Sequence, residues 1–205
     1  MKSAFKITAS AGSSKPRRLP EPGPSLGTVI QIIDIGTQVS VFDGEEKQQR
    51  KVRWVFELPE QLIKDDEGND RPMIIAKEYT NSTHERATQS KLIEALRGKP
   101  LGDEDRNDYD ITQHLGATAL LSIEHKPRPS GGGQYAAIGS AMALPKSQKK
   151  PAKYGKPLAW GVELGRDETF NAFPDWLKDK IEASAEFVQM GGSARPFEDG
   201  DDVPF

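Results

Sequence analysis

The sequence predicts a mainly β domain, and three observations carry this prediction. Short runs rich in β-branched and aromatic residues recur through the middle of the chain. The clearest run, from Arg50 to Leu58, alternates apolar and polar residues with the period of two that is typical of a strand with one buried face. Glycine, proline or polar turn residues separate the runs, and helical spacing of apolar residues is confined to two segments.

Five strands are expected, because each run ends at a glycine, a proline or a cluster of polar residues. Gly36 is expected to bend the first strand and Gly139 to bulge the last one, since an isolated glycine inside a strand is typical of such irregularities. The predicted strands cover residues 28–42, 50–58, 73–80, 117–125 and 135–144. Residues 127–133 join the last two strands, and their two prolines and three consecutive glycines predict an open connection.

A helix is expected between the third and fourth strands. Ser82 or Thr83 can cap its N-terminus, and Gly98 can end it. A short helical turn is expected over residues 111–116. Three strands, a helix and two further strands is the element order of an OB-fold, a five-stranded Greek-key barrel. The sequence therefore predicts an OB-fold-like barrel over residues 27–145.

The segments on either side of the predicted barrel differ from it in composition. Residues 1–26 are rich in proline and small residues, with basic residues among them, and predict a flexible basic arm. Residues 146–190 begin as a lysine-rich linker and continue with an extra strand from Leu158 and a helix from Pro174, both expected to pack on the barrel. Residues 191–205 predict a disordered acidic tail.

Composition limits the classes of function. With 205 residues, 35% of them hydrophobic, the chain can build a medium-sized core with appended segments. The absence of cysteine excludes disulfides, thiolate zinc sites and cysteine nucleophiles. The N-terminus lacks the apolar run of a signal peptide, and no stretch approaches the roughly 18 apolar residues of a membrane span. A cytoplasmic protein without membrane contact is therefore expected.

The most specific motif is the C-terminus. Four acids precede Val203, Pro204 and Phe205, and their removal would change the net charge from −3 to +1, because four negative charges are lost. An acidic run alone can serve only to solvate a chain end. Here, however, the proline holds Val203 extended, so that Phe205 can enter an apolar pocket while its carboxylate meets a basic side chain.

This ending resembles the acidic tip of bacterial single-stranded DNA-binding proteins, with Val203 in place of their isoleucine. The resemblance implies that the tip recruits replication or recombination proteins. Being anionic and tethered, the tail can also compete with DNA for a basic surface. The residues expected to carry recruitment are Asp199, Asp201, Asp202, Val203, Pro204 and Phe205.

The body of the chain resembles a family of phage single-stranded DNA-binding proteins. The resemblance covers residues 27–187 and is carried by the runs 52–57, 74–81 and 90–101. It implies binding of single-stranded DNA without sequence specificity, in phage DNA replication, recombination or repair within a bacterial host cell. The N-terminal pattern of the tetrameric bacterial proteins is absent, so the oligomeric state stays open and includes a homodimer.

A strand-binding surface needs cations along the phosphates and flat side chains on which bases stack. OB-folds bind through strands and through the loops that flank them. Trp54 is core if it faces the interior, whereas a shift of register by one residue makes it a base platform. Tyr79 is expected on a solvent-facing row with Lys77. The candidate DNA-binding residues are Lys47, Arg50, Lys51, Arg53, Trp54, Lys77, Tyr79, Lys126, Arg128 and Tyr135.

Three alternatives follow from the same residues. A recombination mediator or annealing protein would share the DNA binding and also pair complementary strands. An RNA-binding domain would leave the acidic aromatic tip without a purpose. A nuclease would bind a divalent metal through clustered acids, but these lie in one polar loop, so no metal, cofactor or enzymatic activity is expected. The acids in question are Asp103, Glu104, Asp108 and Asp110.

Overall fold

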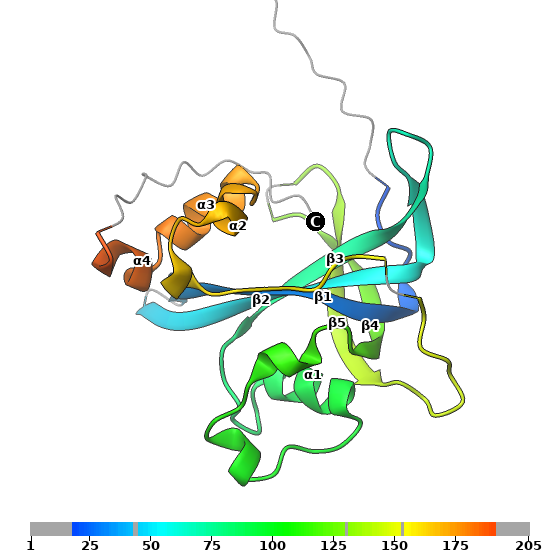
Figure 1. Cartoon of the computed structure of the whole chain (residues 1–205), viewed down its shortest axis with the longest axis horizontal. Helices are drawn as coiled ribbons and strands as arrows, with labels where there is room; N and C mark the ends of the chain where they lie inside the picture. The colour runs from blue at the N-terminus through cyan, green and yellow to red at the C-terminus, as the bar shows by residue number, and fades with distance from the viewer. Residues whose placement is uncertain (1–17, 43–44, 130, 153, 192–205) are drawn as a thin grey trace, which may run out of the picture.

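The computed structural model describes residues 18–42, 45–129, 131–152 and 154–191. Its main element is an open, mainly antiparallel sheet of six strands in the order β3-β2-β1-β4-β5, with β6 pairing in parallel with β1 (Figure 1). The mainly β prediction is therefore confirmed. The strands are β1 (Gly23–Phe42), β2 (Glu45–Lys64), β3 (Asp70–Thr80), β4 (Thr118–Pro127), β5 (Gln134–Ala143) and β6 (Leu158–Trp160).

The predicted irregularities in the strands are present. Gly36 adopts a φ of 72°, which favours glycine, and the β1–β2 register shifts between Asp34 and Thr37. Gly139 is skipped in the pairing of β4 with β5, as expected for a bulge. The prediction that the second strand ends near Pro59 is wrong, because β2 continues to Lys64 after a register shift that accommodates the proline.

Helix α1 (Thr88–Arg97) lies between β3 and β4, and it ends as predicted at Gly98, whose φ is 70°. Its predicted start is wrong. The N-cap is Ala87, without a side-chain cap, because the nearby hydroxyls bind other backbone groups. Thr83 Oγ1 donates to the carbonyl of Arg106 at 2.6 Å, and Ser82 Oγ accepts from the amide of His84 at 3.2 Å.

Two short 3₁₀ helices, Glu104–Arg106 and Ile111–His114, follow α1, and the second matches the predicted helical turn. A third covers Val162–Leu164, within the stretch expected to be a strand; β6 ends just before it. None of the helices in the described part of the chain has the length and apolar character needed to cross a lipid bilayer.

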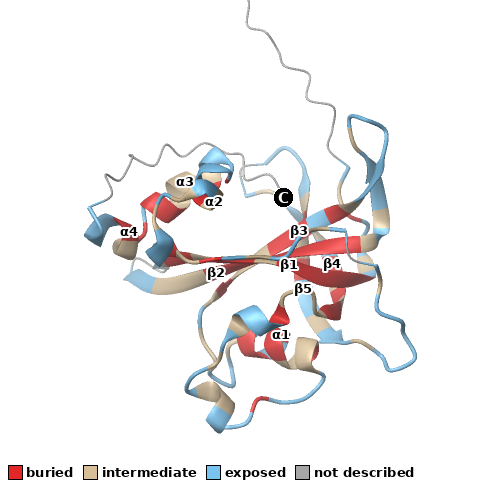
Figure 2. Cartoon of the chain, in the orientation of Figure 1, coloured by how far each residue is buried: buried red, intermediate tan, exposed pale blue. Residues whose placement is uncertain are grey.

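The main core fills the concave side of the sheet, and α1 covers one end of it (Figures 1 and 2). The predicted apolar face of the second strand lies here, since Val52, Trp54, Phe56 and Leu58 are fully buried. These large side chains, removed from water together, supply the hydrophobic stabilisation of the sheet.

A second core lies on the opposite face of β1, where Ile33 and Ile35 pack against the C-terminal segment. That segment forms α2 (Glu168–Asn171), α3 (Asp175–Glu182) and α4 (Ala185–Gln189), of which only α3 was predicted. The prediction that β2 has one buried face is wrong, because Arg53, Val55 and Glu57 on its outer face are also buried.

The two edge strands of the sheet, β3 and β5, lie close to each other. The Lys77 ammonium on β3 donates a 2.7 Å hydrogen bond to the carbonyl of Ile138 on β5. A cavity opens beside this bridge, between the two strands and α3. The curvature of the sheet therefore creates a site that neither edge strand could form alone.

Candidate nucleic-acid interface

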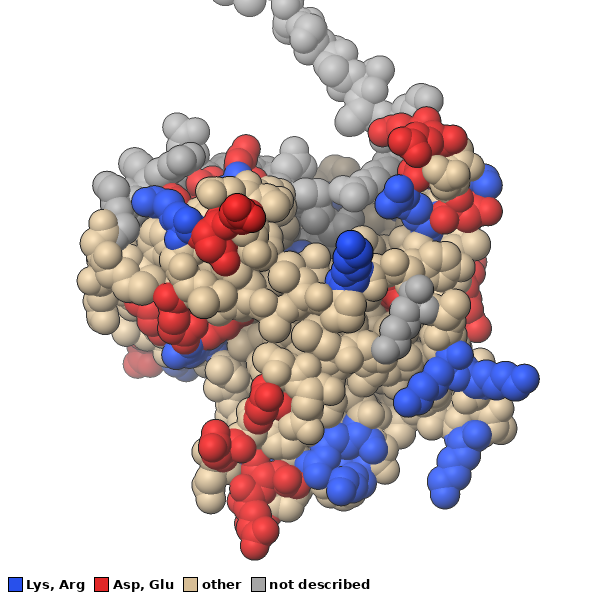
Figure 3. Space-filling view, viewed as in Figure 1, with Lys and Arg blue, Asp and Glu red and all other residues tan. Residues whose placement is uncertain are grey.

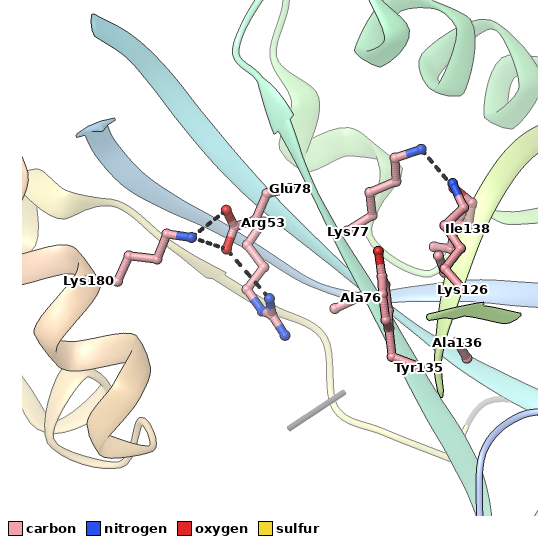
Figure 4. Close-up of a pocket in the computed structure, with 10 residues that line it drawn as sticks. Arg53, Ala76, Lys77, Glu78, Lys126, Tyr135, Ala136, Ile138 and Lys180 are labelled. Carbon is pink, nitrogen blue, oxygen red and sulfur yellow. Dashed lines mark hydrogen bonds and ion pairs between the residues drawn. The ribbon is translucent and has the colours of Figure 1, made fainter. Parts of the chain in front are cut away.

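The cavity between β3 and β5 has a volume of about 310 Å³, and we call it the edge groove. Figure 4 shows basic side chains on both of its sides. Lys77 and Lys126 lie on one side, together with Tyr135. Arg53 and Lys180 lie on the other side, around Glu78. Strands β2, β3, β4 and β5 and helix α3 all contribute to it.

Lys77 and Lys126 form the cationic side of the groove that is next to β5. Lys77 is half-buried, whereas Lys126 is exposed and pairs with Glu124 at 3.4 Å. Burial lowers the pKa of Lys77, and the neighbouring charge of Lys126 lowers it further, while Glu124 opposes the shift. Two cations held this close favour an anion between them, because an anion offsets both the desolvation and the mutual repulsion.

The opposite side of the groove is an ionic cluster centred on Glu78. Lys180 Nζ on α3 lies 2.7 Å from this carboxylate, and Arg53 Nη1 on β2 lies 3.7 Å from it. The Arg53 guanidinium also lies over the Trp176 ring, 4.6 Å from its centroid. Burial lowers the pKa of Arg53, and Glu78 opposes that shift. Two cations share one carboxylate, so this side of the groove also has net positive charge.

Small apolar side chains line the groove between the two cationic sides. Ala76 on β3 and Ala136 and Ala137 on β5 present only methyl groups. Tyr135 is the cross-strand partner of Lys126, and its half-buried ring lies at the same end of the groove. A planar ring can pack against this surface, because small side chains leave room and the tyrosine offers an aromatic face.

Four of the predicted DNA-binding residues meet in this one groove, although they come from four strands. They are Arg53, Lys77, Lys126 and Tyr135. Lys51 lies on the same outer face of β2 as Arg53, where its ammonium donates to Gln49 and Thr80 and burial lowers its pKa.

Neither aromatic candidate on β2 and β3 is exposed to a base: Trp54 follows the core alternative, and the solvent-facing row predicted for Tyr79 is wrong. Trp54 is 0% exposed, and its indole donates to Gln89 within the core at 3.4 Å. Tyr79 is 4% exposed, and burial raises its pKa. Lys77 and Tyr79 do share a face as expected, but that face is the interior of the sheet, and Lys77 reaches the groove only because β3 is an edge strand.

The remaining predicted cations lie elsewhere. Arg50 is bound by two carboxylates, Asp34 at 2.5 Å and Glu163, which raise its pKa and neutralise its charge. Lys47 is exposed on the projecting end of the β1–β2 hairpin. Arg128 begins the connection from β4 to β5, where its amide donates to the carbonyl of Gly133 at 3.0 Å. Arg50 is thus unsuited to binding phosphate. The β4–β5 connection, which Arg128 begins, lies beside the edge groove.

Sequence reasoning missed three residues of the site, namely Glu78, Trp176 and Lys180. The spacing of Trp176 and Lys180 places both on one side of a helix, which is detectable from the sequence. That this helix docks beside β3 is a tertiary relationship, and no local pattern in the sequence indicates it.

The acidic loop of the nuclease alternative is exposed. Asp103, Glu104, Asp108 and Asp110 lie on the surface, and Figure 3 shows acidic side chains gathered beneath α1. Asp110 accepts hydrogen bonds from its neighbour Thr112. In residues 18–191, leaving aside the few not described, no three histidine or acidic side chains come together as a metal site. The metal-nuclease alternative thus gains no geometric support.

Residues 1–17 of the predicted basic arm and residues 192–205 of the predicted tail lie outside the described residues. The arm prediction is wrong for residues 23–26, which begin β1 and pair with β4. Comparison of the sequence with models of known protein families and with curated proteins finds no match. The functional assignment therefore depends on the edge groove and on the residues that form it.

Proposed function

We propose that the protein binds single-stranded DNA without sequence specificity along the edge groove, in DNA replication, recombination or repair. The observation that carries this proposal is the convergence of four cations around an apolar floor with a tyrosine at one end. Cations that follow the phosphates and an aromatic ring that stacks on a base are the two components of single-strand binding, and each stacked base contributes roughly 1 to 3 kcal/mol.

The sheet topology supports an OB-fold-like barrel. In such a barrel the five strands close through a pairing of the third strand with the fifth, and binding uses strands 2 and 3 with the loops after strands 1 and 4. Here β3 approaches β5 through the Lys77–Ile138 hydrogen bond, and α1 lies between β3 and β4. The edge groove lies over β2 and β3 at the base of the β4–β5 connection, which is the surface that this fold uses.

Single strands fit the groove better than duplex DNA. Alanines line the groove between the cationic sides, so an unpaired base finds room there while its phosphates meet the cations. A duplex keeps its bases stacked inside and could use only the rim cations. Sequence specificity needs paired donors and acceptors aimed at base edges, whereas the groove offers mainly charge and apolar surface.

The C-terminal tip is proposed to recruit replication or recombination proteins. The sequence motif alone supports this proposal. Its acids would provide long-range attraction, and Phe205 with its carboxylate would make the contact. The two proposed activities are separable, because the edge groove is built from residues 53–180 and the tip comprises residues 198–205.

Fluorescence-anisotropy titrations test the proposal directly. Labelled oligo-dT, duplex DNA and RNA would be titrated at two salt concentrations with the full chain and with a chain truncated before Glu198. We expect salt-sensitive preference for the single strand, equal or tighter after truncation because an anionic competitor is removed. Absence of single-strand binding by both forms would refute the function.

A further inference from the structure

We infer that a single strand leaving the edge groove continues along β3 into a second pocket, where one unpaired base packs against Tyr154. This inference depends on the proposed function. The second pocket has a volume of about 360 Å³ and lies between the β2–β3 turn and the segment that precedes β6. Its apolar walls are Ile30, Pro72, Ile74 and Tyr154.

The two pockets lie on one continuous face of β3. Ala76 lines the edge groove and Ile74 lines the second pocket. Residues two apart in a strand point to the same side and are separated by about 7 Å. Val55 and Ile30 extend this apolar surface across the neighbouring strands, where they pack with Ala76. A bound strand therefore meets no interruption between the two pockets.

Tyr154 is held in place by a buried carboxylate. Glu57 on β2 is 1% exposed and accepts hydrogen bonds from the amides of Tyr154 at 3.1 Å and Gly155 at 2.8 Å. A buried carboxylate requires such donors, so this contact fixes the segment to the sheet at one defined point. Tyr154 nevertheless stays 52% exposed. Its backbone is thus fixed to the sheet while the residue remains half open to solvent.

The charges around the second pocket suit a base rather than a phosphate. Arg71 is paired with Asp65 at 2.5 Å, and Lys64 is paired with Asp70 at 2.7 Å, so the rim is close to neutral. The exposed Lys156 follows Tyr154 by two residues. Glu57 adds a further negative charge to the lining, which disfavours a phosphate there. The apolar walls can accept a nucleobase while the lysine attracts the adjoining phosphate.

The size of the pocket also favours a base over a protein partner. The exposed apolar surface here is contributed mainly by Ile74 and Tyr154, each about half exposed at 52%. A specific protein interface buries on the order of 800 Å² per partner, which is far more than two half-exposed side chains provide. A nucleobase requires only one flat face and an apolar wall.

The test compares Tyr154→Ala with Tyr154→Phe in the full chain. We expect the alanine variant to bind a long oligo-dT at least about 5-fold more weakly, because a stacked base is lost, and the phenylalanine variant to bind like the wild type. Circular dichroism and thermal melting would show that both variants fold. Equal affinity of all three proteins would overturn the second pocket.

Abasic substitution identifies what the pocket holds. One base at a time is removed from the oligonucleotide, and one position should weaken binding to the wild type but not to Tyr154→Ala. The alanine variant could bind weakly although no abasic position affects the wild type and the variant differently. That result would refute a base at Tyr154 and would assign the residue a protein contact or a structural role. If the wild type binds no single strand at all, the proposed function itself falls, which distinguishes the two failures.

Discussion

The Lys77 ammonium donates a 2.7 Å hydrogen bond to the carbonyl of Ile138, so one side chain joins the two edge strands of the sheet. The same ammonium lines the edge groove beside Lys126. A strand edge exposes unpaired backbone groups, and here a lysine satisfies one of them from the opposite edge. A single residue therefore bridges the two edge strands and supplies a cation to the groove.

Replacing Lys77 with methionine keeps the length of the side chain and removes its charge. We expect weaker binding of single-stranded DNA, and a slope of log affinity against log salt that is less negative by about 0.7, because one phosphate contact is lost. Anisotropy titrations at several salt concentrations measure this slope. The matched control is Lys91→Met, an exposed lysine on α1 outside the groove. Identical slopes for the two variants would argue against a phosphate contact at Lys77.

Protonation of His114 should destabilise the fold. Its ring is buried, and burial, followed by the charge of Arg97, lowers its pKa in the folded state. As pH falls below the ordinary value of about 6.5, the unfolded chain binds a proton before the folded chain does, so the free energy of unfolding decreases by up to about 1.4 kcal/mol per pH unit.

Urea unfolding at pH 7.5 and 5.5 measures this decrease, with His114→Gln as the comparison. The variant will be less stable at both pH values, because Tyr109 loses the 2.8 Å partner that it has in His114. Its loss of stability between the two pH values should nevertheless be smaller than that of the wild type. An equal loss would assign the pH dependence to other groups.

Gly36 should tolerate no side chain. Its φ is 72°, and an added Cβ would lie 2.6 Å from Ser184 Cβ in the segment that leads into α4. Gly98 has a similar φ of 70°, but an added Cβ there meets no atom within 4 Å. Both alanine variants incur backbone strain of about 1 to 2 kcal/mol, and Gly36→Ala should lose about 1 to 3 kcal/mol more from overpacking. Thermal or urea unfolding of the two variants measures the difference in their free energies of unfolding. Equal destabilisation would show that the C-terminal helices can move to accommodate the added methyl group.

Deleting Phe205 should separate the two proposed activities. Single-strand affinity should stay unchanged, because the edge groove is intact, whereas binding to replication or recombination partners should be lost. Pull-down of replication and recombination proteins with the wild-type chain, the deletion and a Phe205→Trp variant, which retains an aromatic ring, measures the second activity. Partner binding that survives the deletion would remove the tip from the mechanism.

The fold was predictable where one local pattern decides the structure. The alternation through Val52, Trp54 and Phe56 indicates a strand and its buried face, and Gly98 marks the end of a helix by its backbone conformation alone. The start of α1 was not predictable, because Ser82 and Thr83 can either accept from the first amides of the helix or bind other backbone groups. Local sequence cannot decide between these partners.

The sequence indicated the kinds of residue that line the candidate site, but it indicated only some of the individual residues. Lys126 and Tyr135 are cross-strand neighbours, which the hairpin pattern indicates. The burial of Tyr79 was not predicted, because Lys77, two residues earlier in the same strand, suggests that this face of the strand is exposed to solvent. Lys77 reaches the surface only through the gap between two edge strands, and Lys180 joins the site only through the docking of α3. Both are long-range relationships.

Strand β1 contributes Val29 and Ile32 to one core and Ile33 and Ile35 to the other. During synthesis this strand leaves the ribosome before the helices that cover Ile33 and Ile35. The nascent sheet can pair before those helices exist, so it passes through a stage with one apolar face open to solvent. A chain that stops after β5 would keep this apolar face exposed and would be prone to aggregation. Docking of the C-terminal helices therefore completes the folding of the newly made chain.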